Sequence, residues 1–285
     1  MTDQKSLKNI IDYYDQTRFD YRVAWDNSLT PAVHFGFYDD KASDHTNALM
    51  NTNRVLADLV GIREGERVLD AGCGKGGSCF WLAINRGVEA VGITPVQTQI
   101  DDCKAQAAKL QLENQTSFYL ADYCEMPFDA NSFDVVWACE SLCHAEEKLA
   151  FYQEAYRVLK PGGRLVIAEY LRTKRPLQPQ EEQLLMAWLN RWAILDIDTE
   201  QEHFNNAQKA GFESIKIQDV TKNTRTSLRN LHRNSTNWLW FSALLRFLRL
   251  RTKIQHNNQR ASITQYQALE QKLWFYSFIT AKKLG

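Results

Sequence analysis

The chain has 285 residues, of which 44% are hydrophobic and 24% are charged, and its formal net charge at pH 7 is zero. This is the composition of an ordinary globular protein, long enough for one sizeable core with an added cap or for two small domains. The neutral total indicates no particular partner, and no apolar run reaches the roughly 18 residues of a membrane span.

Strands and helices alternate along the chain and are joined by short links. Strands are expected at 66–71, 88–94, 116–122, 133–140, 163–171, 213–220 and 273–281. Helices are expected at 47–60, 77–87, 95–112, 146–160 and 199–212. This alternation favours a parallel sheet with helices on both faces. The predicted fold class is α/β, with a Rossmann-like, seven-stranded, mostly parallel sheet.

We expect a single domain with four parts. Residues 1–60 form an N-terminal helical arm that caps the substrate, and residues 61–219 form the sheet core. Residues 220–270 form a basic, amphipathic lid insert, and residues 271–285 return as the last strand of the core.

A glycine-rich turn follows the first predicted strand. Gly72, Gly74 and Gly77 fit the pattern G-x-G-x-x-G between a strand and a helix. Such a turn lets the backbone approach a dinucleotide or another nucleoside ligand, or it is only a tight structural turn. A dinucleotide site needs an acid after the second strand, where residues 92–95 read Gly-Ile-Thr-Pro. Asp122, at the end of the third strand, is instead placed to meet an adenine amino group.

Four segments together resemble class I S-adenosylmethionine-dependent methyltransferases over about residues 50–220: "VLDAGCGKGG", "VGIT....Q", "LADY..MPF....FDVVW" and "RVLKPGGRLVIAE". Sterol C-methyltransferases, tocopherol methyltransferases and cyclopropane synthases have Gly-Ile-Thr with Gln five residues after the Thr, which Thr94 and Gln99 match. By this resemblance both contact the ribose, and 61–219 is the S-adenosylmethionine-binding core. The cofactor-binding candidates are Asp70, Gly72, Gly74, Thr94, Gln99, Asp122, Tyr123 and Cys139.

The ends of two strands supply the catalytic candidates. Residues 140–145, Glu-Ser-Leu-Cys-His-Ala, resemble the Glu-Ala-Thr-(Cys or Val)-His-Ala string of sterol C-methyltransferases, and tocopherol and sugar O-methyltransferases have related strings. The Ala-Glu-Tyr at the end of the fifth strand resembles the sterol enzymes' Tyr-Glu-Trp. The resemblance implies that Glu140, His144 and Glu169 serve catalysis. The alternatives are that Glu140 binds a backbone N–H or the ligand's ammonium, that Glu169 is structural, and that His144 is a loop residue.

The segment "YYDQTRFDYRVAWDNSLTPAVHFGFYD" resembles the aromatic N-terminal arm of the sterol enzymes. It implies substrate contacts for Tyr13, Tyr14, Trp25 and His34, although these aromatic residues are also ordinary core formers. Carboxylates and aromatic faces stabilise a carbocation formed by alkene methylation, and a base then removes a proton. Because the Glu-x-x-x-His-Ala string of residues 140–145 and Glu169 resemble the sterol C-methyltransferases, methylation at carbon is slightly favoured. For a hydroxyl acceptor, His144 takes the hydroxyl proton instead.

Charge is unevenly distributed, because residues 220–269 contain nine Lys and Arg and no Asp or Glu. Within this stretch, "NWLWFSALLRFLRLRTK" at 237–253 has apolar residues at helical spacing, which predicts an amphipathic helix. Trp238 and Phe241 are its candidates for substrate contact. The helix is interpreted as a lid over an apolar acceptor, a membrane-surface helix, a site for an anionic head group, or a packed helix with solvated arginines.

Six cysteines lie within or beside apolar runs, at positions 73, 79, 103, 124, 139 and 143. With no secretory signal recognised, we expect reduced thiols and a cytoplasmic protein, with peripheral membrane contact through 237–253 as an option. Cys139, Cys143 and His144 lack a fourth ligand with zinc-like spacing, so no metal is expected.

The sequence thus predicts methyl transfer from S-adenosylmethionine to a hydrophobic small molecule, isoprenoid or polycyclic, with nucleic acid excluded as a partner. The alternatives are O- or N-methylation of a natural-product hydroxyl, phenol or amine, and an S-adenosylmethionine-binding regulatory scaffold. A nicotinamide oxidoreductase is the remaining rival class, which a titration with S-adenosylhomocysteine and NAD discriminates. Acceptor identity, methylated atom and oligomeric state are outside what the sequence predicts.

Overall fold

The computed structural model of the chain describes residues 4–24 and 34–285, with side chains in the first of these ranges from residue 7 to 18 and at residue 20. Trp25 therefore lies outside the described residues.

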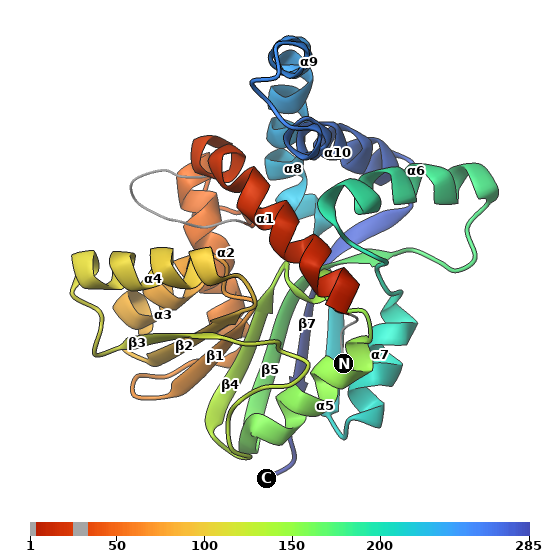
Figure 1. Cartoon of the computed structure of the whole chain (residues 1–285). Coiled ribbons are helices and arrows are strands. Elements are labelled where there is room, and N and C mark those ends of the chain that lie inside the picture. Colours follow the sequence, from red (N-terminus) through yellow and green to blue (C-terminus); the bar gives the residue numbers. More distant parts are fainter. Residues whose placement is uncertain (1–3, 25–33) are drawn as a thin grey trace.

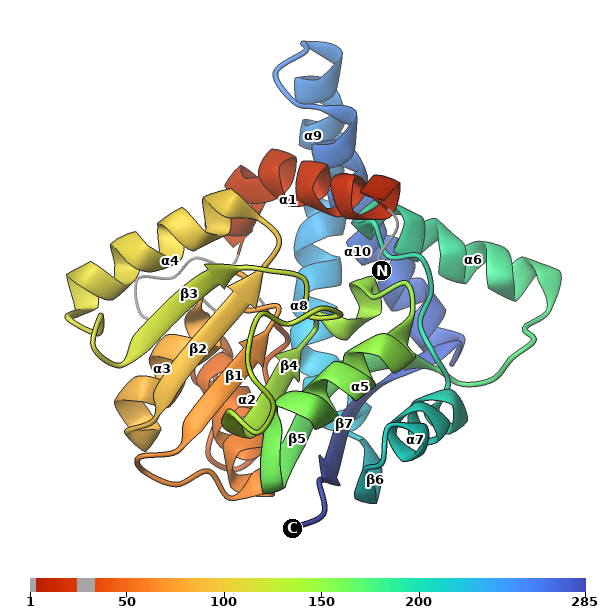
Figure 2. The same cartoon turned by 60° about the horizontal axis from the view of Figure 1, so that its bottom comes forward.

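A single seven-stranded sheet forms the centre of the molecule (Figure 1, Figure 2). Its strands are β1 (Arg67–Ala71), β2 (Glu89–Thr94), β3 (Thr116–Leu120), β4 (Phe133–Cys139), β5 (Leu159–Arg172), β6 (Glu213–Asp219) and β7 (Trp274–Lys282). Their order is β3-β2-β1-β4-β5-β7-β6, and β7 is the one strand that runs in the opposite direction to the others. The predicted Rossmann-like, mostly parallel sheet is confirmed.

Helices cover both faces of this sheet. They are α1 (Gln4–Ala24), α2 (His45–Val60), α3 (Gly77–Arg86), α4 (Gln97–Leu110), α5 (Lys148–Val158), α6 (Pro179–Leu189), α7 (Glu200–Lys209), α8 (Thr221–Asn237), α9 (Leu239–Phe247) and α10 (Lys253–Glu270). One buried cluster joins the sheet to α2, α3, α4, α8 and α10, and a second joins its other face to α5 and α7. No described helix is long and apolar enough to cross a membrane.

The alternation of side chains along each strand assigns residues to these two clusters. In β4, Val135 and Trp137 pack in the first cluster, whereas Val136 and Ala138 pack in the second. Strands buried on both faces need continuous apolar sequence, which explains why the strand predictions agree with the structure to within a few residues.

The structure differs from the prediction in the basic insert. The single helix expected at 237–253 is wrong, because α9 ends at Phe247 and Arg249 adopts a left-handed conformation with φ of 58°. The insert instead forms three helices, of which α8 and α10 pack against β7 and against each other. The short α9 projects beyond them (Figure 1).

Candidate active site

The glycine turn lies where β1 ends and α3 begins. Gly72 has φ of 89°, and a Cβ there would lie 2.4 Å from the Cβ of Ser141. Gly74 has φ of 51°, but a Cβ there would meet no atom within 4 Å. Gly72 therefore permits close packing of two strand ends, and Gly74 keeps the space beside the turn open.

A first cavity opens beside this turn, at the carboxyl ends of the parallel strands, where ligands of open α/β sheets bind. All eight predicted cofactor-binding residues line it: Asp70, Gly72, Gly74, Thr94, Gln99, Asp122, Tyr123 and Cys139. The Thr94 hydroxyl donates to Gln99 Oε1 over 2.6 Å, so the two predicted ribose contacts already lie together. We call this space the cofactor cavity.

Carboxyl groups give the cofactor cavity a preference for cations. Burial raises the pKa of Asp70 to about 7, and the Cys79 thiol donates to its Oδ2 over 3.4 Å. Asp122 lines the same space, and its Oδ1 accepts from the backbone N–H of Cys124 over 2.8 Å. A ligand with a sulfonium and an ammonium group would compensate these carboxylates, so the residues fit S-adenosylmethionine.

A second, larger cavity of about 670 Å³ adjoins the first. Apolar and aromatic residues form part of its wall: Tyr13, Phe35, Tyr170, Trp192, Ile194, Leu231 and Trp238. Polar side chains from the insert form another part: Ser227, Asn230, Arg233, Asn234, Ser235, Arg251, Asn258, Gln259 and Ser262. We call this space the acceptor cavity. Tyr14, Glu140 and His144 line both cavities and define the junction between them.

Glu140 is fixed at the junction by three donors. Its carboxylate accepts hydrogen bonds from the Phe35 backbone N–H over 2.6 Å, from the Tyr276 hydroxyl over 2.7 Å and from the Tyr170 hydroxyl. The residue has φ of 52°, which turns the chain at the end of β4. Burial raises its pKa to about 7 although these hydrogen bonds act in the opposite direction. Glu140 thus anchors the segment at Phe35 to the sheet.

His144 is an uncharged imidazole at the junction. Its Nδ1 lies 3.4 Å from the carbonyl oxygen of Ala193, and its Nε2 lies 3.0 Å from the hydroxyl of Tyr14. A carbonyl oxygen only accepts, so Nδ1 carries the proton and the lone pair of Nε2 faces the junction. Burial lowers the pKa of His144 to about 4, which leaves the ring uncharged near neutral pH.

Glu169, which the sequence led us to expect in catalysis, lies outside the walls of both cavities. Glu169 is buried and accepts hydrogen bonds from the backbone N–H groups of Cys143 and Tyr170 over 2.8 and 2.9 Å. Burial raises its pKa to about 8. Strand alternation explains this position, because Tyr170 points to the acceptor side of β5 and Glu169 to the opposite face. The same alternation would have identified Tyr170, which we had not predicted.

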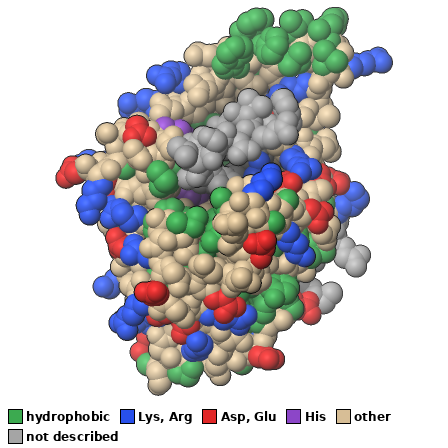
Figure 3. Space-filling model, turned by 90° about the vertical axis from the view of Figure 1, so that its left-hand side faces the viewer, with side chains coloured by type: hydrophobic (Ala, Val, Ile, Leu, Met, Phe, Trp, Pro, Cys, Tyr) green, Lys and Arg blue, Asp and Glu red, His purple; other side chains and the backbone are tan. Residues whose placement is uncertain are grey.

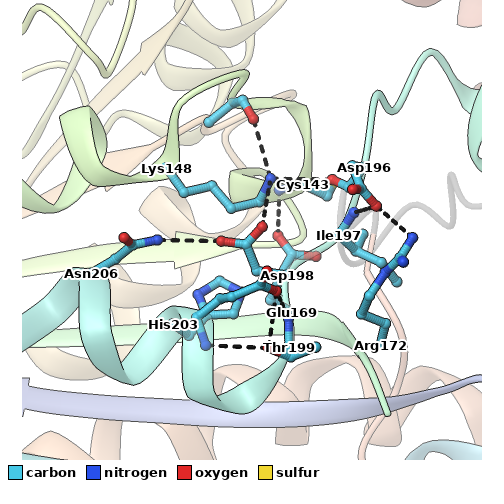
Figure 4. A network of polar contacts seen from close by, with 12 residues as sticks. Cys143, Lys148, Glu169, Arg172, Asp196, Ile197, Asp198, Thr199, His203 and Asn206 are labelled. Carbon is cyan, nitrogen blue, oxygen red and sulfur yellow. Dashed lines mark hydrogen bonds and ion pairs between the residues drawn. The ribbon is translucent and has the colours of Figure 1, made fainter. Parts of the chain in front are cut away.

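Figure 4 shows Glu169 within a polar network behind the junction. Lys148 is buried there, donates to the carbonyl oxygen of Asp196 over 3.1 Å and lies 3.7 Å from Asp198 Oδ1. Arg172 pairs with Asp196 over 2.7 Å. Lys148 also donates to the carbonyl oxygen of Ala145 over 3.2 Å, so it links the residue that follows η1 (Leu142–His144), a single 3₁₀ turn, to the segment after Ala193.

The predicted substrate contacts fall in different places. Tyr13, Tyr14 and Trp238 line the acceptor cavity, whereas His34 lines the cofactor cavity. Phe241 lines neither cavity and is exposed on α9, so its contact with a substrate stays a prediction. The amides and arginines of α8 and α10 were missed, because scattered polar residues on a helix are typical of a solvated face.

Helix α1 lies across both cavities. Leu7, Ile10 and Arg18 line the cofactor cavity, and Tyr13 and Asp20 line the acceptor cavity. Ion pairs and hydrogen bonds hold α1 at two places: to α4 through Arg18–Asp102 and Asp15–Thr98, and to the insert through Asp20–Arg251 and Tyr13–Asn258. Helix α1 therefore covers the place where the two cavities meet.

A sheet of this order, with a cation-compatible cavity at a glycine turn after its first strand, is the architecture of a nucleoside-binding α/β protein. The methyltransferase domain family matches residues 69–167. The chain is 30% identical over 258 residues to 27-O-demethylrifamycin SV methyltransferase of Amycolatopsis mediterranei, covering 88% of this chain and 89% of that protein. It is 29% identical to the chloroplastic tocopherol O-methyltransferase of Arabidopsis thaliana, over 84% of this chain and 72% of that protein.

Solved structures agree on the fold. The [4+2]-cyclase SpnF superposes with a TM-score of 0.79 at 24% identity, covering 97% of this chain and 96% of that one. Geranyl diphosphate C-methyltransferase from Streptomyces coelicolor A3(2) superposes with a TM-score of 0.75 at 19% identity, covering 99% of both chains. The chain belongs to the S-adenosylmethionine-dependent methyltransferases. It is an enzyme that uses S-adenosylmethionine and acts on a small molecule.

Among the residues that the structure describes, no three His, Cys, Asp or Glu side chains are grouped to hold a metal ion. All six cysteines are free thiols, and Cys73, Cys79, Cys103 and Cys143 are buried.

Proposed function

We propose that this enzyme methylates a hydroxyl oxygen on an oxygenated, ring-bearing small molecule held in the acceptor cavity. The observation that carries the proposal is the neutral His144 at the junction, with Nε2 3.0 Å from a hydroxyl group. An acceptor hydroxyl that replaces or joins the Tyr14 hydroxyl would face both this nitrogen and the cofactor cavity. Proximity and alignment at such a junction supply much of the catalysis of an in-line displacement.

The chemistry assigns a simple task to the protein. S-adenosylmethionine supplies an electrophilic methyl group on its sulfonium sulfur. The acceptor oxygen forms a bond to this methyl carbon while the C–S bond breaks, and His144 Nε2 takes the hydroxyl proton. A pKa of about 4 suffices for this base, because the proton becomes strongly acidic once the oxygen carries the methyl group. Glu140 and Glu169 hold the surrounding backbone in place.

The positions of Glu140 and Glu169 support methylation at oxygen rather than methylation at carbon. The preference for carbon depended on the Glu-x-x-x-His-Ala string of residues 140–145 and on Glu169, whose carboxylates would stabilise a carbocation. Glu169 lies outside the cavity walls, and Glu140 is engaged by three donors. Carbon methylation remains the second candidate, favoured by the aromatic rings of Tyr170 and Phe35 beside Glu140.

The acceptor class follows from the wall of the acceptor cavity. Its aromatic part suits a hydrophobic ring system, and its amide and guanidinium groups suit oxygen substituents, which a bare hydrocarbon chain would leave unpaired. An oxygenated polycycle or macrocycle therefore fits better than an unsubstituted isoprenoid chain. The similarity to an enzyme named for a rifamycin substrate supports the same class.

The decisive experiment measures transfer of labelled methyl groups to a panel of oxygenated polycycles, macrocycles and prenyl alcohols, with the methylated atom identified by NMR. We expect His144→Ala to lower kcat by about 10²–10⁴-fold while the affinity for S-adenosylhomocysteine stays unchanged. Tyr14→Phe serves as the matched variant, which keeps the ring but removes the hydroxyl. Wild-type turnover in His144→Ala, or methylation at carbon alone, would overturn the proposal.

A further inference from the structure

The segment 238–250, which contains α9, forms an apolar tip. Seven of its large hydrophobic side chains are exposed by 38% or more, and Leu239 and Leu245 are half-buried. The exposed ones are Trp238, Trp240, Phe241, Leu244, Phe247, Leu248 and Leu250. Within α9 only Ser242 is buried, and its hydroxyl lies 2.9 Å from His256 Nδ1 on α10. Figure 3 shows these hydrophobic side chains gathered at one extremity of the molecule. Helix α9 thus contributes little to the core and presents its apolar side chains outward.

Cationic side chains lie directly beside the tip. A surface hollow of about 330 Å³ is lined by Arg246, Arg249, Leu250, Arg251, Thr252 and Lys253. Arg251 is paired with Asp20. In the described part of the chain, no ion pair involves Arg246, Arg249 or Lys253. The hollow therefore attracts anions.

We propose that the tip binds the surface of an anionic phospholipid bilayer. Trp, Phe and Leu side chains bury favourably at the boundary between head groups and acyl chains, and adjacent Arg and Lys side chains attract anionic lipids. The tip has this composition, with the hollow positioned to receive phosphate groups beside it. An exposed apolar patch rimmed by cations is uncommon on the surface of a protein that works alone in water.

The charges disfavour a second copy of the chain as the occupant. In a symmetric dimer formed through the tip, the same patch of both copies would meet. Arg246 and Arg249 would then approach their own equivalents, and residues 220–269 contain no Asp or Glu to compensate them. The surface of an anionic bilayer supplies the opposite charge.

The position of the tip fits this occupant. Trp238, the first residue of the tip, and Arg251, which follows its last residue, both line the acceptor cavity. A protein docked through the tip would hold that cavity close to the bilayer surface. The inference about docking is independent of the proposed methyl acceptor, since vesicle binding is measured without turnover.

The test is flotation of the full-length protein with vesicles of phosphatidylcholine alone or with 30% phosphatidylglycerol. We expect the wild type to bind the anionic vesicles and to release on raising NaCl to 1 M, where the Debye length falls to about 3 Å. Trp240→Ser with Phe247→Ser, and separately Arg246→Glu with Arg249→Glu, should each weaken partitioning about tenfold or more. Cofactor affinity, measured by calorimetry, should match the wild type in both variants.

Matched controls change exposed residues elsewhere. Ile84→Ser removes an exposed apolar side chain from α3, and Lys104→Glu with Lys109→Glu reverses two exposed charges on α4. Both should bind vesicles as the wild type does. Brominated lipids should quench the fluorescence of the wild type more than that of Trp240→Phe. Equal vesicle binding by tip and control variants, or a concentration-dependent dimer abolished by the tip variants without any vesicle binding, would overturn the proposal.

Discussion

Binding of S-adenosylmethionine should release protons and tighten as the pH rises from 5.5 to 7.0. Asp70 and Glu140 both line the cofactor cavity, and burial raises the pKa of each to about 7. Below pH 7 the ligand-free enzyme therefore holds both groups largely protonated. A nearby cation favours the ionised carboxylate, so binding of the sulfonium and ammonium groups lowers both pKa values and expels the protons.

The expected size follows from the ionised fraction of each carboxyl. For a pKa of 7 in the free enzyme and below 5 in the complex, that fraction rises about 15-fold between pH 5.5 and 7.0, and affinity rises by the same factor. If the two carboxyl groups ionise independently, their factors multiply, and the affinity for the cofactor rises about 200-fold over this pH range. Over this range the ligand's amino group, with a pKa near that of an ordinary α-amine at about 7.7–8.0, stays mainly charged.

Isothermal titration calorimetry in buffers of different ionisation enthalpy measures both quantities. Asp70→Asn should remove one of the two carboxyl contributions to the pH dependence and one released proton. Asp129→Asn, which changes an exposed carboxyl outside both cavities, should leave the profile unchanged. An affinity that is constant from pH 5.5 to 7.0, or binding without proton release, would refute the electrostatic reasoning.

Three further predictions concern single positions. Gly72→Ala should destabilise the protein, because its Cβ would collide with Ser141. Gly74→Ala should fold with less than about 2 kcal/mol of backbone strain but bind the cofactor poorly. Thermal unfolding measures the first effect and calorimetry of cofactor binding measures the second. Asp122→Ala should weaken cofactor binding by about 1–3 kcal/mol, and unchanged affinity in calorimetry would contradict its placement. Glu169→Ala leaves two buried N–H groups without their acceptor and should lower the free energy of unfolding by about 2–4 kcal/mol. Burial raises the folded pKa of Glu169 from 4.5 to about 8, so its protonation stabilises the fold fully below about pH 4.5 and this contribution is lost progressively as the pH rises to 8. Urea unfolding of Glu169→Gln should therefore show a flatter pH dependence than the wild type between pH 5 and 8.

The sheet and the cofactor cavity were predictable because their signals are local in the sequence. Strands buried on both faces need apolar runs, and a tight turn with positive φ needs glycine. Parallel strands bring their carboxyl ends to one edge, so Thr94 and Asp122 reach the same cavity as the turn after β1. The position of Glu169 on the face of β5 away from the cavities was not anticipated, because a resemblance between strand ends says nothing about which face a side chain occupies.

Only the tertiary structure decided which distant groups share the reaction site and which surface is left uncovered. Tyr14 and His144 are 130 residues apart, and their contact depends on how α1 packs across the strand ends. Glu140 is held by Phe35, Tyr170 and Tyr276 from three separate elements. The apolar spacing of α9 predicted a helix but not its exposure, since periodicity shows that a helix has an apolar face and only packing determines whether another part of the chain covers it.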